Sequence, residues 1–187
     1  MTTTPGTDRV LLTRTAAAAY LGVDRNSLSA GRVAGQPEPV LTVGRTGFYD
    51  ADQIIELSSR GGPRAGHEVD ERTRALIIAA APTIPSGTTV VGYMEITRLH
   101  TKPDGSPLGN ADVARWADKG TMIEPVARFD TPANQAAGTV ERTPPLYDLD
   151  AYLKHAKTHP PVRVTAVDRT RIDHAVVDEL RRTHTLG

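Results

Sequence analysis

The sequence contains no cysteine. A disulfide framework, a zinc site with thiolate ligands and a cysteine nucleophile are therefore excluded. Aromatic residues are also scarce, at 4% of the 187 residues, and hydrophobic residues make up 39%. Because large side chains are too few to supply one extensive core, the composition favours two small cores over a single large one.

The sequence also lacks a long apolar run and an excess of charge of either sign. No stretch approaches the ~18 consecutive apolar residues of a membrane span, and Met1 to Asp8 does not have the pattern of a signal peptide. We therefore expect a cytoplasmic, nucleoid-associated protein without a membrane partner. The 22 basic and 22 acidic residues cancel, so any attraction to phosphate has to come from local patches.

Arginine accounts for 18 of the 22 basic residues. The planar guanidinium suits bidentate contact with guanine better than the lysine ammonium does. A GC-rich genome would produce the same excess, so the arginine content alone does not separate the two explanations.

The chain contains an internal repeat. Glu38-Pro39-Val40 recurs as Glu124-Pro125-Val126, and Tyr49-Asp50-Ala51-Asp52 recurs as Tyr147-Asp148-Leu149-Asp150. An apolar helical segment follows each Tyr-Asp motif, and a short helix precedes the Glu-Pro-Val motif in both halves. Because the features recur in the same order, they predict two copies of one structural unit.

The first copy begins with the pattern of a helix-turn-helix. Thr13 is suited to cap a helix that runs to Leu21, and Gly22 ends that helix. Asp24 can cap a second helix over Arg25–Val33. The short link between them favours two helices at a steep angle.

A hairpin and a third helix follow in the first copy. Val40–Val43 and Phe48-Tyr49 have the pattern of two short strands, joined by the turn Gly44-Arg45-Thr46-Gly47. Asp50, and Asp148 in the second copy, are expected to cap the next helix and not to act as catalytic carboxylates.

The second copy keeps this plan with two additions. Its first helix is expected over Met94–Leu99, and a longer loop leads to a second helix over Asn110–Lys119. Twenty residues separate Val126 from Tyr147, against eight between Val40 and Tyr49. We expect the added length in the wing, because a hairpin tip tolerates insertions.

These patterns predict a mainly α fold with small β wings, in which two tandem winged helix-turn-helix domains are joined by a helical spacer. The C-terminal helix, expected over Asp168–Thr183, either folds back on the second domain or pairs with another copy of the chain. The expected parts are a flexible tail (1–8), the first winged domain (9–60), the spacer (61–88, helical over Glu68–Ala81), the second winged domain (89–160) and a C-terminal strand and helix (161–187).

The run Thr13-Arg14-Thr15-Ala16-Ala17-Ala18-Ala19-Tyr20-Leu21-Gly22-Val23, followed by Arg25-Asn26-Ser27-Leu28, Pro39-Val40, Gly44-Arg45 and Tyr49-Asp50, resembles the winged-helix proteins of the MerR and excisionase group. The resemblance covers about residues 10–58. A weaker one covers about residues 90–156. It implies that the second helix of each copy enters the major groove and that the wing touches the adjacent backbone or minor groove. MerR-type activators usually carry one such unit before a long dimerisation helix, whereas here a second unit follows.

The expected partner is double-stranded DNA, and the candidate contacts lie on the two second helices and the wings. Arginine and asparagine match guanine and adenine edges in the major groove, and an arginine between glycines can approach a narrow minor groove. A solvated helix face and a plain turn are the alternative interpretations. The candidates are Arg14, Arg25, Asn26, Ser27, Ser29, Arg32, Arg45 and Thr46 in the first copy, and Asn110, Asp112, Arg115, Lys119, Arg128 and Arg142 in the second.

No catalytic constellation, nucleotide-binding loop, metal site or cofactor is expected from the sequence. The leading hypothesis is a sequence-specific DNA-binding transcription regulator, a repressor with two non-identical reading heads. An excisionase or architectural DNA-bending factor is the second hypothesis. A protein-interaction module without DNA binding is the third, because the net charge is zero and Asp112 would repel phosphate. Asp112 could instead accept from a cytosine amine or orient Arg115.

Overall fold

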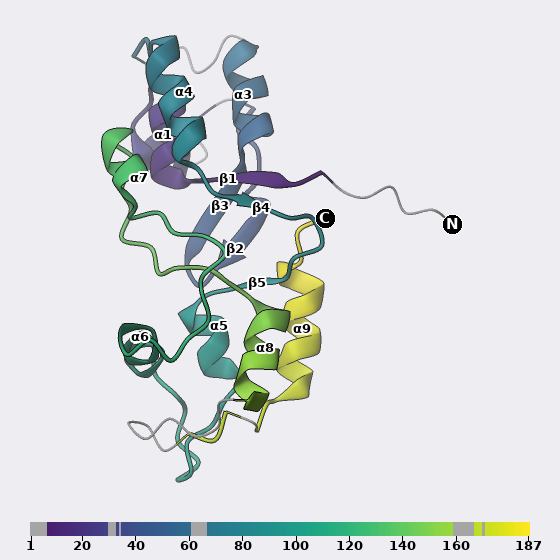
Figure 1. Ribbon diagram of the computed structural model, residues 1–187. Coiled ribbons are helices and arrows are strands. Elements are labelled where there is room, and N and C mark those ends of the chain that lie inside the picture. Colours follow the sequence, from purple (N-terminus) through teal and green to yellow (C-terminus); the bar gives the residue numbers. More distant parts are fainter. Residues whose placement is uncertain (1–6, 30–32, 34, 61–66, 159–166, 170) are drawn as a thin grey trace. The chain divides into compact units, whose positions relative to one another are not determined.

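Two units make up the computed structural model, and each is assembled from two separate stretches of chain (Figure 1). Unit 1 comprises Met1–Ser86 and Arg128–Thr143, and unit 2 comprises Gly87–Ala127 and Pro144–Gly187. The structure describes residues 7–29, 33, 35–60, 67–158, 167–169 and 171–187. Most of the expected tail, the start of the spacer and most of the expected C-terminal strand lie outside these residues.

A four-stranded antiparallel sheet forms the base of unit 1 among the described residues, in the order β2-β3-β1-β4. The strands are β1 (Arg9–Thr13), β2 (Leu41–Val43), β3 (Thr46–Asp50) and β4 (Thr83–Ile84). The expected mainly α fold is therefore wrong, and the protein is mixed α/β. The hairpin β2–β3 was expected, but β1 and β4 add to it through pairings between residues distant in sequence, which local patterns do not reveal.

The helix-turn-helix begins as the sequence predicts. Helix α1 (Arg14–Leu21) starts at Thr13, whose hydroxyl accepts a hydrogen bond from the Ala16 amide at 3.2 Å. It ends at Gly22, which has φ +67°. Helix α2 (Arg25–Ser29) follows Asp24, whose carboxylate accepts from the Asn26 amide at 2.7 Å. The expected continuation of α2 to Val33 falls mostly outside the described residues.

Replacing Gly22 by alanine is expected to destabilise unit 1 by more than ~1 kcal/mol. Left-handed backbone disfavours any side chain, and here a Cβ would also lie 2.0 Å from the carbonyl oxygen of His67. Urea unfolding of Gly138→Ala provides the control, because Gly138 is left-handed in the same unit but its Cβ would meet nothing within 4 Å. Equal losses in the two variants would contradict the close approach at Gly22.

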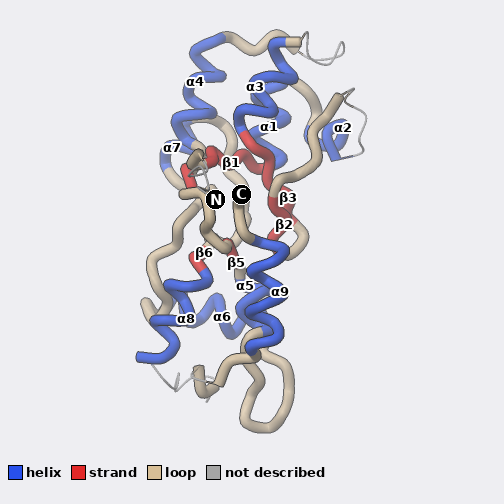
Figure 2. The backbone as a smooth tube through the Cα atoms, turned by 90° about the vertical axis from the view of Figure 1, so that its right-hand side faces the viewer, coloured by secondary structure: helices blue, strands red, loops and turns tan. Residues whose placement is uncertain are grey.

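The core of unit 1 lies between the sheet and three helices, with α1 beside α3 (Ala51–Ser59) and α4 (Glu71–Ala80) (Figure 2). The alanines of α1 permit this close helix packing because they project little beyond the backbone. Helix α4, the expected spacer, contributes the buried Ile77 to the same core. Other core members are Leu12, Ala17, Leu28, Tyr49 and Ile54.

The stretch Arg128–Thr143 belongs to unit 1, although it lies in the insertion that we expected in the second wing. Phe129 is 2% exposed, and its ring packs on Phe48 with the centroids 5.1 Å apart. Helix α7 (Pro132–Ala136) contacts α4, and the Asn134 side-chain amide donates to the carbonyl of Ala80 at 3.2 Å. These contacts make a distant segment part of the core of unit 1.

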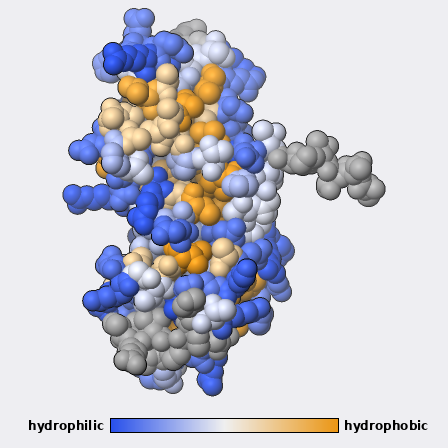
Figure 3. Space-filling model, viewed as in Figure 1, coloured by the Kyte–Doolittle hydropathy of each residue, from blue (hydrophilic) through white to orange (hydrophobic). Residues whose placement is uncertain are grey.

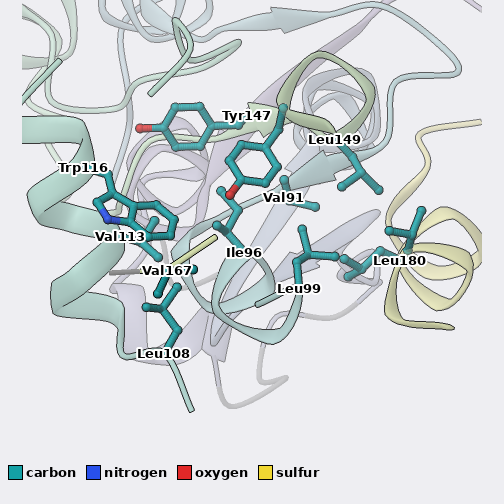
Figure 4. Packing of buried hydrophobic residues seen from close by; sticks show 12 residues of the cluster. Val91, Ile96, Leu99, Leu108, Val113, Trp116, Tyr147, Leu149, Val167 and Leu180 are labelled. Atoms are coloured by element: carbon teal, nitrogen blue, oxygen red, sulfur yellow. The ribbon is translucent and has the colours of Figure 1, made fainter. Parts of the chain in front are cut away.

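Unit 2 is mainly helical around a two-stranded antiparallel ladder of β5 (Val90–Val91) and β6 (Tyr147–Asp148). Its helices are α5 (Tyr93–Arg98), α6 (Asn110–Asp118), α8 (Leu149–Thr158) and α9 (His174–His184). Side chains from all of these elements meet in one core, which includes Trp116 and Leu180 (Figure 4). The C-terminal helix α9 thus packs within unit 2. None of the helices in the described ranges has the length and hydropathy needed to cross a membrane.

The internal repeat has a structural counterpart in the strand pairings. Leu12 pairs with Tyr49 in unit 1, and Val91 pairs with Tyr147 in unit 2. At the base of the hairpin, the Val40 amide donates to the Phe48 carbonyl at 2.9 Å. The equivalent bond in unit 2 joins Val126 to Leu146 at 2.8 Å.

The repeated Asp-x-Asp motifs have the same local role in both units. The Asp50 carboxylate accepts from the Asp52 amide at 2.9 Å, and that of Asp148 accepts from the Asp150 amide at 2.8 Å. The expected capping role of Asp50 and Asp148 is confirmed. These carboxylates satisfy free amides at the start of α3 and α8.

Candidate nucleic-acid interface

Helix α2 of unit 1 presents polar residues on one side and packs against the core of the unit on the other. Arg25 and Asn26 are exposed, Ser27 is half-buried and Leu28 is completely buried. Ser29 ends the described helix, and Arg32 lies outside the described residues. The exposed side of α2 therefore carries one cation and one amide that could meet base edges.

Arg25 is held by a carboxylate from a distant part of the chain. Its Nη2 donates to Oε1 of Glu141 at 2.7 Å. The Arg25 side chain is 54% exposed, whereas that of Glu141 is 11% exposed. The second oxygen of Glu141, Oε2, is buried and has no hydrogen-bond partner in the described part of the chain. The charge of Glu141 therefore depends on Arg25 for its compensation.

The β2–β3 hairpin of unit 1 carries the expected wing residues. Arg45 is exposed at the turn, next to Gly44 with φ +61°, and Thr46 is the half-buried first residue of β3. Arg14, the first residue of α1, is half-buried. Its Nε is buried and lacks a hydrogen-bond partner among the described residues. Arg45 is thus the more accessible of the two cations.

Helix α6 is the counterpart of α2 in unit 2. Asn110, Arg115 and Lys119 are exposed, while Val113 and Trp116 are buried on the other side. Trp116 is 1% exposed and lies in the core of unit 2. The helix therefore separates an outer polar side from an inner apolar side, as α2 does.

Asp112 lies beneath the exposed arginine of α6 and is not free to repel phosphate. Its carboxylate accepts from the Gly109 amide at 3.2 Å, from Arg115 at 3.1 Å and from Lys102 at 3.1 Å. The hydrogen bond from the Gly109 amide, followed by that from Lys102, holds the pKa of Asp112 below its usual value. Asp112 is thus an ionised helix cap that is paired with Arg115, whose side chain is 58% exposed.

Arg128 and Arg142, the expected cations of the second wing, are exposed but belong to unit 1. They flank the stretch that supplies Phe129 and Glu141. The structure therefore groups them with Arg25 and Arg45 in one unit, and not with α6.

Three residues that hold the candidate helices were not found from the sequence. Glu141 pairs with Arg25 across 116 positions, so no local pattern relates the two. Lys102, in the loop before α6, forms an ion pair with Asp112. Arg169 is 3% exposed, lies over the Trp116 ring and donates to the Thr121 carbonyl at 2.7 Å. Of the contacts on the candidate helices, the sequence indicated only that Asp112 could orient Arg115, three residues later on the same helix.

Unit 1 also exposes an apolar surface over α4 and α7 (Figure 3). Leu76 of α4 is 44% exposed, and neighbouring alanines of both helices reach the solvent. This surface is formed by other segments of the chain than α2 and the β2–β3 hairpin, and it is apolar where those two carry arginines. Exposed apolar patches are typical of surfaces that bind proteins, whereas surfaces that bind DNA are polar and basic.

No family model, curated protein or solved structure matches this chain. The resemblance to the MerR and excisionase group remains a prediction. The candidate interface accordingly rests on the geometry of the residues described above.

Proposed function

We propose that this protein binds double-stranded DNA sequence-specifically and acts as a transcription regulator, a repressor with two non-identical reading heads. The observation that carries the proposal is shared by the two units. In each, the second helix of a helix pair buries apolar residues on one side and presents a half-exposed arginine on the other, Arg25 in α2 and Arg115 in α6. Arginine is the side chain that most often contacts guanine in the major groove.

In this proposal each reading helix enters a major groove. The arginine donates to O6 and N7 of guanine, and the neighbouring Asn26 or Asn110 is placed to contact adenine. Arg45 at the wing tip contacts the backbone or minor groove. Because the two helices differ in sequence, one chain would read an asymmetric site. The zero net charge predicts weak binding to random DNA, since phosphate contacts supply most of the non-specific affinity.

Two other functions follow from particular features. An excisionase or architectural factor would use the same contacts but bend the DNA or assemble along it. A protein-interaction module is supported by the exposed apolar surface of α4 and α7 and by the absence of net charge.

Arg25→Lys and Arg115→Lys are expected to weaken binding to the preferred duplex by about 1–3 kcal/mol each, and to change binding to random duplex little. Lysine keeps the charge but loses the fork that pairs with guanine. The preferred duplex is selected with the full wild-type chain from a randomised double-stranded library, and affinities are measured by fluorescence anisotropy over a salt series.

Arg60→Lys is the matched control, because Arg60 is 73% exposed on the C-terminal side of α3, outside the proposed contacts. Equal losses on both duplexes would show that Arg25 and Arg115 contact only phosphate. If the wild-type chain binds no duplex at low salt, the proposal fails and the protein-interaction function remains. Bending of the selected duplex would favour the architectural function over repression.

A further inference from the structure

We propose that Glu141 in unit 1 and Asp112 in unit 2 are positioning residues that hold the reading arginine in one orientation and so determine base selectivity. The inference rests on the proposed DNA-binding function and adds the residues that determine its selectivity. Neither carboxylate would touch DNA itself. Each would act through the guanidinium that it holds.

The two arginine–carboxylate pairs share one pattern of side-chain exposure although they are built differently. Arg25 and Arg115 are 54% and 58% exposed, whereas Glu141 and Asp112 are 11% and 13% exposed. The carboxylate therefore lies inside and the guanidinium reaches outward in both units. Asp112 comes from the same helix as Arg115, three residues earlier, while Glu141 comes from a segment 116 residues away from Arg25.

Two exposed ion pairs of this chain, Arg60–Glu56 and Arg181–Asp150, lack that asymmetry. In the pair Arg60–Glu56 the carboxylate is 60% exposed, and in Arg181–Asp150 it is 68% exposed. Pairs of this kind are solvated on both sides and constrain the side chains weakly. The low exposure of Glu141 and Asp112 distinguishes their pairs from these two, and the Arg9–Asp50 pair, with Asp50 11% exposed, shares it at the start of α3.

Separating Glu141 from Arg25 would leave a desolvated charge without compensation. Asp112 would keep its pair with Lys102 at 3.1 Å, so its hold on Arg115 is the weaker of the two. Glu141 depends on Arg25 in particular, because its other oxygen, Oε2, has no hydrogen-bond partner in the described part of the chain. The guanidinium has five N–H donors in a rigid fork. A carboxylate that accepts from one edge of this fork fixes the direction in which the rest of the guanidinium points.

The same pairing lowers the attraction of the arginine to phosphate, because the two opposite charges largely cancel at a distance. A held arginine gains little from the backbone of random DNA but keeps its directed contact with a base. Removing the negative charge while keeping the shape should therefore reduce selectivity and increase non-specific binding at the same time.

The test compares Glu141→Gln and Asp112→Asn with the wild-type full chain on two probes, the duplex selected from the randomised library and a random-sequence duplex of equal length. We expect the affinity ratio between the probes to fall about tenfold in each variant, which is within the discrimination of one bidentate contact. Binding to the random duplex should become tighter, with a salt dependence steeper by about one ion.

Glu56→Gln and Asp150→Asn are matched controls in units 1 and 2. They remove the same charge from exposed pairs, and should change both probes equally and only slightly. Glu141→Asp and Asp112→Glu keep the net charge but misplace the carboxylate. These variants should also lose selectivity. They test the inference even if Glu141→Gln or Asp112→Asn does not fold. Circular dichroism and Trp116 fluorescence check the fold of every variant.

An equal rise in affinity on both probes would overturn the inference, because the carboxylates would then only mask charge. An unchanged affinity ratio in the Gln, Asn, Asp and Glu variants would overturn it as well. If the wild-type chain binds neither probe, it is the proposed function that fails. The two failures are thus distinguishable.

Discussion

Replacing Phe129 by alanine is expected to lower the free energy of unfolding of unit 1 by about 3–5 kcal/mol, the usual cost of removing a buried phenylalanine. Phe129 is 2% exposed and packs on Phe48, which is completely buried in β3. The loss should be near the upper end if the sheet cannot close the cavity.

Hydrogen exchange of the α1 and α3 amides measures this change, because both helices pack in the core of unit 1. Val140→Ala is the control in the same segment, since Val140 is 45% exposed and its truncation should cost little. Trp116, the single tryptophan, lies in the core of unit 2, so its fluorescence reports the unfolding of that unit separately. Equal effects of the two substitutions would show that Arg128–Thr143 does not contribute to the core.

Acidification is expected to destabilise unit 2 through His100. The ring is 3% exposed, with Nε2 2.6 Å from the Tyr152 hydroxyl and Nδ1 3.3 Å from the Arg171 carbonyl. Because a carbonyl only accepts, Nδ1 carries the proton and Nε2 accepts from Tyr152. Burial, aided by the charge of Arg169, lowers the pKa of His100 from 6.5 to about 4.

The direction of the pH effect follows from this shift. The folded-state pKa is below the unfolded value, so between pH 6.5 and about 4 the unfolded chain binds a proton that the folded chain does not. The contribution of neutral His100 is fully present above pH 6.5 and is lost as the pH falls towards about 4. The total loss is about 3 kcal/mol.

Urea unfolding followed by Trp116 fluorescence measures this loss, since the His100 and Trp116 rings are 6.0 Å apart in one core. His100→Gln removes the titrating group and should flatten the pH dependence by about one proton. His174→Gln is the control, because His174 is an exposed histidine at the start of α9 in the same unit. A pH dependence unchanged in His100→Gln would contradict the assignment to His100.

The local features of both units could be predicted from the sequence. Thr13, Gly22, Asp50 and Asp148 have the expected roles at helix ends, because a cap depends on backbone amides within three residues. The internal repeat predicted equivalent elements in two halves, and the equivalent strand registers of Tyr49 and Tyr147 agree with it.

Some helix ends were predicted less well. The C-terminal helix begins at His174, after the cap Asp173, and not at Asp168. Both aspartates are suited to begin a helix, and the apolar pattern does not distinguish them. The side of each reading helix that faces outward was nevertheless predictable, because Leu28, Val113 and Trp116 recur at helical spacing from the polar residues.

The sequence by itself determined the caps, the repeat and the polar faces of α2 and α6, since each depends on residues within one or two helical turns. Only the tertiary structure decided that β1 and β4 extend the hairpin into a sheet, that Phe129 completes the core of unit 1 and that Glu141 holds Arg25. These contacts join residues tens to more than a hundred positions apart. Their partners are chosen by the packing of the whole unit, which no local pattern encodes.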